Sequence, residues 1–474
     1  MAKHGVYVSQ QATSVSTPVV AESGVPFFIG TAPVQSAAKS AAAGVPVLCT
    51  SWDEAVEKLG YSDDWGNYTL CEAMYSHFKL FGCQPAIFLN VLDITSMTEK
   101  VTAADVTMED RKAKLPIAAL DNDTLVVKVA GGTGEALVRG NDYATYYDGE
   151  FLVIEAISTG KIAEAEAVNV AYTKVTPTSV KAADVASGME GIENCLTLFG
   201  IVPDLICAPG WSHTTSVAAV MATKANGING MFKAKAVIDL DTSATGVRSY
   251  DNAANAKNAA NFVDSAEVVC WPCVKLGEYT FHLSTQVCGL MAKVDTDNGG
   301  IPYESPSNKA LKCDSLVLAD GTEVNLTLAQ ANILNGAGIV TALNFMGGWV
   351  AWGNYTASYP GNTDVKDCHI AESRMFAWVG NSLIKTFWSK LDKPMTRRFI
   401  DSVLDTCGIW LNGLVGSGYL LGARVEMVEA ENPLTNLMQG IIKLHVYMTP
   451  PSAAQEINFV LEYDAAYVTA ALQA

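Results

Sequence analysis

The sequence predicts a mixed α/β and α+β multidomain protein, with a layered α/β core, an inserted β-domain and extended arms at both ends. Apolar strands followed by helices recur across residues 25–92 and 185–320, which is the pattern of a layered sheet. Residues 93–184, which separate these two segments, carry mainly strand signals. Residues 4–21 carry no formal charge and hold β-forming residues in an extended pattern, so an arm is expected there.

Length and composition limit the possible functions. The chain has 474 residues, which corresponds to two to four domains at roughly 100–200 residues each. It is 49% hydrophobic and 17% charged, so it can bury a large core and lacks the composition of a disordered chain. The 31 basic and 49 acidic residues give a net charge of −18. An acidic chain is a poor ligand for phosphate backbones, and we expect no direct contact with nucleic acid.

Cysteine usage and apolar runs indicate the compartment. The eleven cysteines are scattered between Cys49 and Cys407, without the dense spacing of a small secreted domain. No apolar run near the first residue marks a signal peptide. Residues 324–363 are uncharged but interrupted by Asn and Gly, whereas a bilayer span needs ~20 mainly apolar residues. We therefore expect a soluble protein from a reducing compartment, with no membrane insertion.

The first α/β segment begins with a short apolar strand at 26–30. Ser51 can cap the following helix, with Glu54 placed for a capping box. A second helix is predicted at about 70–81. Residues 85–92 form a nearly continuous apolar run, which is typical of a strand buried on both faces.

Residues 93–184 are predicted to form a separate β-domain inserted into the α/β part. The predicted strands lie at 125–130, 143–147, 151–157 and 168–175. The run Asp148-Gly149-Glu150 between the second and third of these is a short-hairpin signature.

The α/β pattern then resumes and completes a middle domain of residues 25–92 plus 185–320. Helices are predicted at 189–199, 214–226 and 250–262, and strands at 204–210, 234–240 and 267–271. The predicted C-terminal domain, residues 321–454, contains two helices at about 371–391 and 395–414, each with an amphipathic stripe.

The two ends are predicted to be arms, at residues 1–24 and 455–474. Beyond Pro450-Pro451 the apolar residues alternate again, which predicts a strand. Unpaired strands can add to the sheet edge of a neighbouring subunit. The candidate residues for such contacts are Gly5, Val6, Tyr7, Val8, Val15, Val19, Ile457, Phe459, Leu461 and Tyr463.

No motif of catalysis or phosphate binding is complete. Gly210-Trp211-Ser212-His213 lacks the second glycine of a nucleophile elbow, because position 214 is Thr, and a loop with a helix cap is expected. Gly131-Gly132-Thr133-Gly134 lacks the Lys-Ser/Thr of a phosphate loop. We expect no catalytic residues and no cofactor.

Metal sites are not expected either. None of the six histidines lies three or four residues from another, so zinc spacing is absent. Asp295 and Asp297 resemble the start of a calcium loop, but its glycine and distal glutamate are misplaced; a helix end and turn are expected. Cys270 and Cys273 have redox spacing, but the segment around them, residues 268–271, reads as a buried strand, and two core residues are expected.

One charge cluster stands out. Lys385, Lys390, Lys393, Arg397 and Arg398 fall within 14 residues that contain one acid, Asp392. The cluster is either a solvated corner between two helices or a patch that meets an acidic partner.

The early part of the chain holds four short motifs: His4-Gly5-Val6-Tyr7-Val8, Pro26-Phe27-Phe28-Ile29-Gly30-Thr31-Ala32, Thr50-Ser51-Trp52-Asp53-Glu54-Ala55 and Phe78-Lys79-Leu80-Phe81-Gly82-Cys83. In this order they resemble motifs of the contractile tail sheath family of bacteriophages and phage-like particles. The first is similar to the family's opening PGVY, with His in place of Pro.

The later blocks carry the resemblance further. Residues 289–309, from Gly289 through Asp295 to Ser305-Pro306-Ser307-Asn308, resemble AG..A..D...G...SPAN. Leu334-Asn335-Gly336-Ala337-Gly338-Ile339 resembles LN..GI. Residues 348–356 resemble G...WG.RT, with Asn354-Tyr355 where the family has Arg. The resemblance covers most of the chain except residues 93–184.

The resemblance implies a structural subunit that polymerises in stacked rings around an inner tube and contracts to drive it through a cell envelope. The implied partners are other copies of the chain, the tail tube protein, and baseplate and tail terminator proteins. The implied location is a virion tail or phage-tail-like particle, assembled in the bacterial host cytoplasm. The basic cluster would then face the tube, and the inserted domain would project outward. The alternatives are another shell-forming protein, such as a capsid protein, and then an enzyme.

Overall fold

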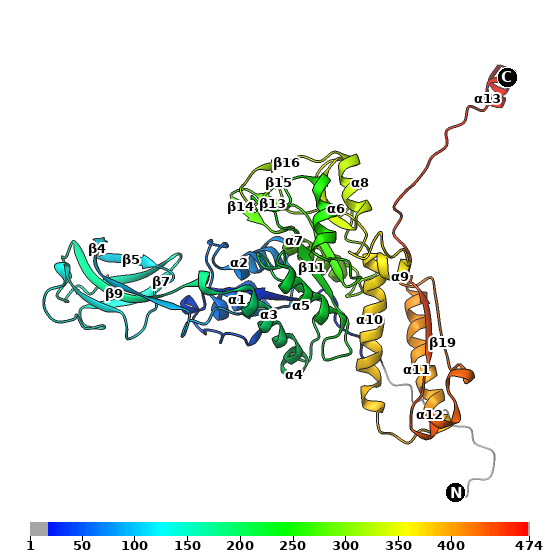
Figure 1. Cartoon of the computed structure of the whole chain (residues 1–474), viewed down its shortest axis with the longest axis horizontal. Helices are drawn as coiled ribbons and strands as arrows, with labels where there is room; N and C mark the ends of the chain where they lie inside the picture. The colour runs from blue at the N-terminus through cyan, green and yellow to red at the C-terminus, as the bar shows by residue number, and fades with distance from the viewer. Residues whose placement is uncertain (1–17, 473–474) are drawn as a thin grey trace, which may run out of the picture.

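The computed structural model describes residues 18–472. Three parts lie side by side (Figure 1). An α/β body occupies the middle, a lobe of β-strands projects from one side, and two long helices with a small sheet lie on the other side. The predicted fold class, a mixed multidomain α/β protein with an inserted β-region, is confirmed.

The body is built on an eight-stranded sheet in the order β18-β17-β12-β11-β10-β1-β3-β2. Its inner strands run parallel, while β2 and β18 pair antiparallel at the edges. The bounds are β1 Pro26–Gly30, β2 Pro46–Cys49, β3 Ala86–Asn90, β10 Leu205–Cys207, β11 Lys235–Asp239, β12 Glu267–Cys270, β17 Ile339–Asn344 and β18 Trp349–Trp352. Strands β1, β3, β11 and β12 are buried at every residue. The nearly continuous apolar runs of β1 and β3 predict this burial, whereas β11 and β12 also bury the charged residues Lys235, Asp239 and Glu267.

The sheet extends past residue 320, where the sequence suggests a domain boundary. Strands β17 and β18 lie in the uncharged stretch and pair with β12 and with each other. Gly353, which follows β18, has φ +146°, and a Cβ there would lie 2.8 Å from Oδ1 of Asn335. Only glycine fits this close approach, which gives a structural reason for the WG motif.

Helices cover the body. They are α1 Trp52–Leu59, α2 Thr69–Met74, α3 Ala182–Gly188, α4 Cys195–Phe199, α5 Thr215–Asn226, α6 Tyr250–Ala259, α7 Leu283–Asp297 and α8 Leu328–Gly336. The predicted cap is confirmed, because Ser51 accepts a hydrogen bond from the amide of Glu54 and the Glu54 carboxylate accepts one from the amide of Thr50. The predicted helix at 70–81 is α2 continued by a π-helical turn, Tyr75–Leu80.

His77 lies in this π-helical turn and is fully buried. Its ring packs near those of Phe28 and Phe78, and neither ring nitrogen has a hydrogen-bond partner among the residues that the structure describes. Burial lowers the pKa of His77 from 6.5 to about 4 because the charged form is poorly solvated there.

Acid is therefore expected to destabilise the fold through His77. Below about pH 6.5 the unfolded chain takes up a proton at this residue, whereas the folded chain stays neutral down to about pH 4. Stability is present above pH 6.5 and is lost as pH falls through this window, by about 1–2 kcal/mol at pH 5. Urea unfolding at pH 7 and pH 5 should show a smaller pH effect in His77→Leu; an unchanged effect would assign it to other groups.

The body also contains a small four-stranded antiparallel sheet, in the order β14-β13-β15-β16. In sequence it lies between β12 and β17 of the central sheet. Its strands are β13 Cys273–Leu276, β14 Tyr279–Phe281, β15 Ser315–Val317 and β16 Glu323–Val324. Cys270 and Cys273, at its junction with β12, are both buried free thiols, as expected for core residues.

The inserted lobe is a six-stranded antiparallel sheet in the order β6-β9-β4-β5-β8-β7. Its strands are β4 Thr98–Glu109, β5 Lys112–Pro116, β6 Val126–Val129, β7 Tyr143–Asp148, β8 Phe151–Ala156 and β9 Ala167–Val175. It has its own apolar core. The hairpin predicted around residues 148–150 is confirmed as β7–β8, while β4 and β5 had no clear sequence signal.

The remaining part consists of α9 Val365–Cys368, α10 Ile370–Phe387, α11 Arg397–Gly416, β19 Gly422–Glu426, α12 Leu434–Met438, β20 His445–Thr449 and α13 Ala466–Leu472. A third apolar cluster joins α10 and α11 through Met375, Trp378 and Leu411. Both predicted amphipathic helices are confirmed as α10 and α11.

Candidate assembly interface

The predicted N-terminal arm meets the described structure at its base. Gly5, Val6, Tyr7, Val8 and Val15 lie outside the described residues. Val19 is described and is 51% exposed. Its amide donates to Oγ1 of Thr386 at 2.9 Å, and this hydroxyl donates back to the Val19 carbonyl at 3.2 Å.

Residues 18–23 run along α10, and we call this segment the strap. The Ala21 amide donates to the Ser382 hydroxyl, and the Trp378 indole donates to the Ala21 carbonyl, both at 2.9 Å. Trp378, Ser382 and Thr386 are four residues apart, so they share one face of the helix. These side chains therefore bind the strap through its backbone N–H and C=O groups. Each such neutral hydrogen bond contributes about 0.5–1.5 kcal/mol to stability.

The inner end of the strap enters a buried ion network. Arg374 lies one turn before Trp378 on the same face and donates to both carboxylate oxygens of Asp295 and to Asp204. The Ser23 hydroxyl donates to Asp295 at 2.5 Å, and the Val25 amide donates to Asp204 at 2.8 Å. Burial disfavours the charged guanidinium, but the two carboxylates outweigh it and raise the pKa of Arg374. The network joins α10 and the strap to the α/β body.

Asp295 and Asp297 lie at the end of α7, as expected. Asp295 forms an ion pair with Arg374. Among the residues that the structure describes, no group of three His, Cys, Asp or Glu could hold a metal ion. None of the described helices combines the length and apolar character needed to cross a bilayer.

The strand predicted at the C-terminal end does not form in the single chain, and its pairing with a neighbouring subunit stays a prediction. Residues 450–464 form no strand, and Ile457, Phe459, Leu461 and Tyr463 are 70–94% exposed. They lie in an extended segment that leaves the body and ends at α13 (Figure 1). A lone strand is not stable without a partner edge, and none of the described edges of this chain pairs with the segment.

Three of the motif blocks described above, at residues 289–309, 334–339 and 348–356, lie together where this C-terminal segment begins. The Gly353 amide donates to the Ser307 hydroxyl at 3.0 Å, and the Asn308 amide donates to the Ala351 carbonyl at 2.6 Å. A pocket of about 770 Å³ lies between these blocks, Asn335 and residues 451–456. Residues of these motifs therefore line the pocket beside the start of the C-terminal arm.

The small sheet β19–β20 has only two strands, so each of them has an open edge. Its two strands pair antiparallel over five residues each, from Gly422–Thr449 to Glu426–His445, and no other described strand joins it. A groove of about 500 Å³ lies between α11 and β19, lined by Leu404, Ile409 and Val425 among others. Sequence reasoning missed β19, because its five residues carry only a short Ala/Val alternation.

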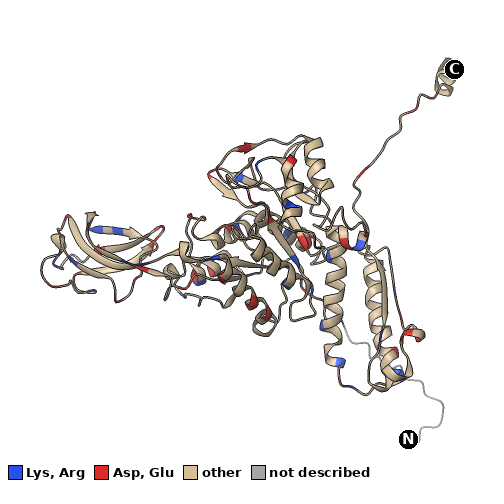
Figure 2. Ribbon diagram, viewed as in Figure 1, with Lys and Arg blue, Asp and Glu red and all other residues tan. Residues whose placement is uncertain are grey.

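The basic cluster divides in the structure. Lys385 is nearly buried and pairs with Glu22 of the strap at 2.6 Å. Arg397 is exposed and pairs with Asp401. Lys390, Lys393 and Arg398 form no ion pair among the described residues. Figure 2 shows basic residues, in blue, at the end of α10 and in the loop that leads to α11. Trp388 and Leu391 in this corner are 59% and 60% exposed.

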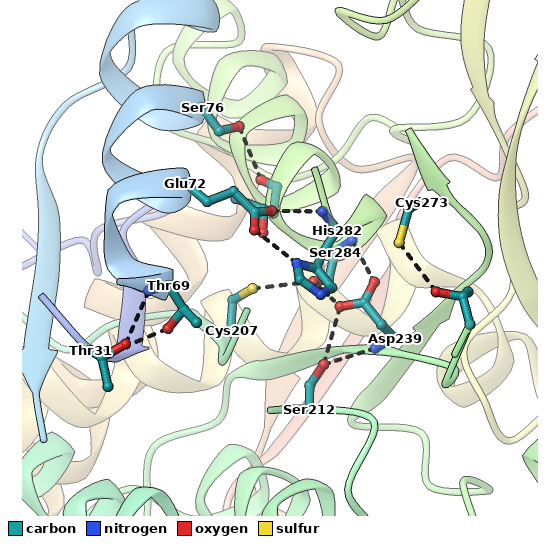
Figure 3. Close-up of polar contacts among 12 residues, drawn as sticks. Thr31, Thr69, Glu72, Ser76, Cys207, Ser212, Asp239, Cys273, His282 and Ser284 are labelled. Carbon is teal, nitrogen blue, oxygen red and sulfur yellow. Dashed lines mark hydrogen bonds and ion pairs between the residues drawn. The ribbon is translucent and has the colours of Figure 1, made fainter. Parts of the chain in front are cut away.

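The carboxyl edge of the central sheet, where open α/β folds usually bind ligands, is filled by protein side chains (Figure 3). The strand order reverses between β1 and β10. There Thr31 contacts Thr69 of α2, and Asp239 accepts hydrogen bonds from Ser212 and from the amide of Ser284.

His282 in this network is bound by Glu72, whose carboxylate accepts from both its amide and its ring Nδ1 at 2.7 and 2.8 Å. Burial acts to lower its pKa, but Glu72 outweighs this and raises it. Neither Ser212 nor Ser284 is hydrogen-bonded to an imidazole in the described structure. The predicted loop at residues 210–213 is confirmed, and Ser212 ties it to β11.

No family profile matches the chain. A tail sheath protein of Burkholderia phage BcepMu is 27% identical over 492 aligned positions, which cover 98% of this chain and 97% of the relative. A putative prophage major tail sheath protein of Pseudomonas aeruginosa strain UCBPP-PA14 is 26% identical over 62% of this chain and 73% of its own length.

The fold also matches solved structures over nearly its whole length. The helical sheath of the anti-feeding prophage in its contracted state aligns with a TM-score of 0.59 and 16% identity, covering 98% of this chain and 100% of that one. The sheath complex of the extracellular contractile injection system PVC, also contracted, aligns with a TM-score of 0.57 and 14% identity, at 98% and 100% coverage.

Proposed function

Because the chain belongs to the contractile tail sheath family, we propose that it is the sheath subunit that forms stacked rings around an inner tube and contracts to drive that tube through a cell envelope. The match to a phage tail sheath protein over both full lengths carries this proposal. The role is structural, since many subunits that each release a modest free energy can power a large stroke without catalysis.

Subunits are proposed to join by β-augmentation. The β19–β20 sheet has open edges, and a strand from a neighbour can satisfy their N–H and C=O groups. Residues 5–17 of one neighbour and the exposed segment around Ile457–Tyr463 of another are the proposed donors. Such joints hold subunits together while the connectors beside them turn.

The proposed partners besides other copies are the tail tube, the baseplate and the tail terminator. The proposed setting is a virion tail or phage-tail-like particle assembled in the bacterial host cytoplasm. Electron microscopy of the purified protein tests the function: tubes are expected, whereas closed shells would favour a capsid-like protein and monodisperse particles an enzyme.

The exposed corner formed by Lys390, Lys393, Arg397 and Arg398 is proposed to face an acidic tube surface. Exposed ion pairs contribute roughly 0–1 kcal/mol each, which suits contacts that break in every ring on contraction. Lys385 is left out of this surface because Glu22 already pairs with it.

Charge reversal of this corner should block assembly on the tube. Arg397→Glu with Arg398→Glu is expected to leave the fold and the tube-free polymer intact but to reduce the yield of tube-bound sheath. Lys100→Glu with Lys161→Glu, two exposed positions in the inserted lobe, gives the same change in net charge as a control. Normal yield of tube-bound sheath in the Arg397/Arg398 variant would place the corner elsewhere.

The inserted lobe is proposed to project outward as a decoration. Its two connections lie together, because the Thr176 amide donates to the Met97 carbonyl at 2.9 Å. The lobe also touches the body, where Gln35 donates to the Ile117 carbonyl and Ser62 to Glu150.

Removal of residues 98–175 with a short Gly/Ser bridge should therefore leave tubes intact, with some loss of subunit stability from those contacts. Tube formation by electron microscopy is the readout. Complete loss of polymer, in a variant whose circular dichroism shows a folded body, would refute the outward placement.

A further inference from the structure

The strap is held with graded strength from its outer to its inner end. At the outer end Val19 and Val20 are 51% and 44% exposed, and the backbone is held by the single hydroxyl of Thr386. In the middle Ala21 is buried between Ser382 and Trp378. The contacts of residues 19–21 use neutral groups and can open one after another, whereas the next residue, Glu22, forms an ion pair with Lys385 at 2.6 Å.

The inner end is held differently. Ser23 and Val25 bind Asp295 and Asp204, the two carboxylates that share the Arg374 guanidinium. Asp295 and Arg374 are 0% and 3% exposed. Opening these contacts would deprive two buried carboxylates of a hydrogen-bond donor each, and hydrogen bonds to charged groups are stronger than those between neutral groups. The inner end is therefore a fixed anchor.

The strap runs antiparallel to α10, from Thr386 at its outer end to Arg374 at its inner end. Those two positions are about 18 Å apart along a helix that rises 1.5 Å per residue. Peeling residues 18–21 would add about 13 Å of extended chain to the connector and would move the point where the arm leaves the body by at most that length.

We propose that residues 18–21 peel from α10 during contraction and lengthen the N-terminal connector, while the Glu22–Lys385 pair and the Arg374 network stay closed. This proposal rests on the proposed sheath function and on the arm joining a neighbour. Contraction changes the spacing of subunits that stay linked, and a β-joint cannot stretch. A reserve of chain held by weak, ordered contacts supplies the added length without breaking the joint.

A reversible cross-link across the outer strap tests the proposal. Val19→Cys with Thr386→Cys places two thiols where backbone and side chain already lie in hydrogen-bond contact. All eleven native cysteines are buried, so mild oxidation should act on the engineered pair. Particles carrying this sheath on its tube would be assembled reduced, oxidised, and then challenged with a stepped rise in urea.

The oxidised particles are expected to stay extended under conditions that contract the reduced ones, and reduction should restore contraction. Ala144→Cys with Glu155→Cys, opposite residues on β7 and β8, provides a cross-link outside the strap that should not affect contraction. Contraction of the oxidised Val19/Thr386 particles at the same urea concentration as the reduced ones would overturn the proposal and leave the sheath function standing.

A second variant keeps the test open if the cysteine pair does not assemble. Thr386→Val with Ser382→Ala weakens the outer strap, so contraction should begin at a lower urea concentration. Thr223→Val with Ser187→Ala is the matched control, because these exposed hydroxyls bond only within their own helices. Equal urea thresholds in the two double variants would contradict the proposal, whereas absence of any tubes from the unmodified chain would contradict the sheath function itself.

Discussion

A chain that lacks residues 1–17 is expected to fold into soluble monomers that do not polymerise. The deletion removes the proposed strand donor but ends where the described structure begins. The strap, its bonds to Thr386 and Ser382, and the Arg374 network therefore remain. Light scattering should report a monomer, and circular dichroism should match the undeleted chain.

A full-length control separates strand pairing from loss of chain length. Val6→Pro with Val8→Pro keeps every residue in place but removes two backbone donors that a β-ladder needs. It should also fail to form long tubes. Long tubes from either variant would show that the N-terminal arm is not a linkage.

Loss of the Arg374 guanidinium is expected to be the most destabilising single change. Arg374→Met leaves Asp295 and Asp204 beside the strap without their cation. Removal of one partner from a buried ion pair costs about 3–5 kcal/mol. Urea unfolding of dissociated subunits should show this loss, together with release of the strap from α10.

Arg397→Met is the matched control, since it makes the same substitution in an exposed pair with Asp401. Its cost should be about 0–1 kcal/mol. Equal costs for the two variants would mean that the buried network does not anchor the strap.

The sequence could predict the elements that carry strong local patterns. Strands β1, β3 and β12 are continuous apolar runs, and α10 and α11 have amphipathic stripes, so both kinds were identified. Strand β17 was missed because the Gly and Asn residues on both sides of it are typical of loops, although five of its six residues are buried. The terminal segment at 457–463 has a strand pattern, yet it pairs with none of the described sheet edges of its own chain.

The candidate interface was less predictable because its contacts join distant positions. Lys385 looks like part of a basic surface, but Glu22, 363 residues away, neutralises it. The hydroxyls of Ser382 and Thr386 have suitable spacing, but nothing local indicates that they bind the backbone of residues 19–21. Tertiary packing decides both outcomes.

A helical reconstruction of the assembled tubes tests the central claim most directly. The account predicts that β19–β20 becomes a larger sheet, with strands from residues 5–17 and from the segment around Ile457–Tyr463 of neighbouring subunits at its two edges. Tubes in which both edges of β19–β20 remain unpaired, or closed shells in place of tubes, would contradict it.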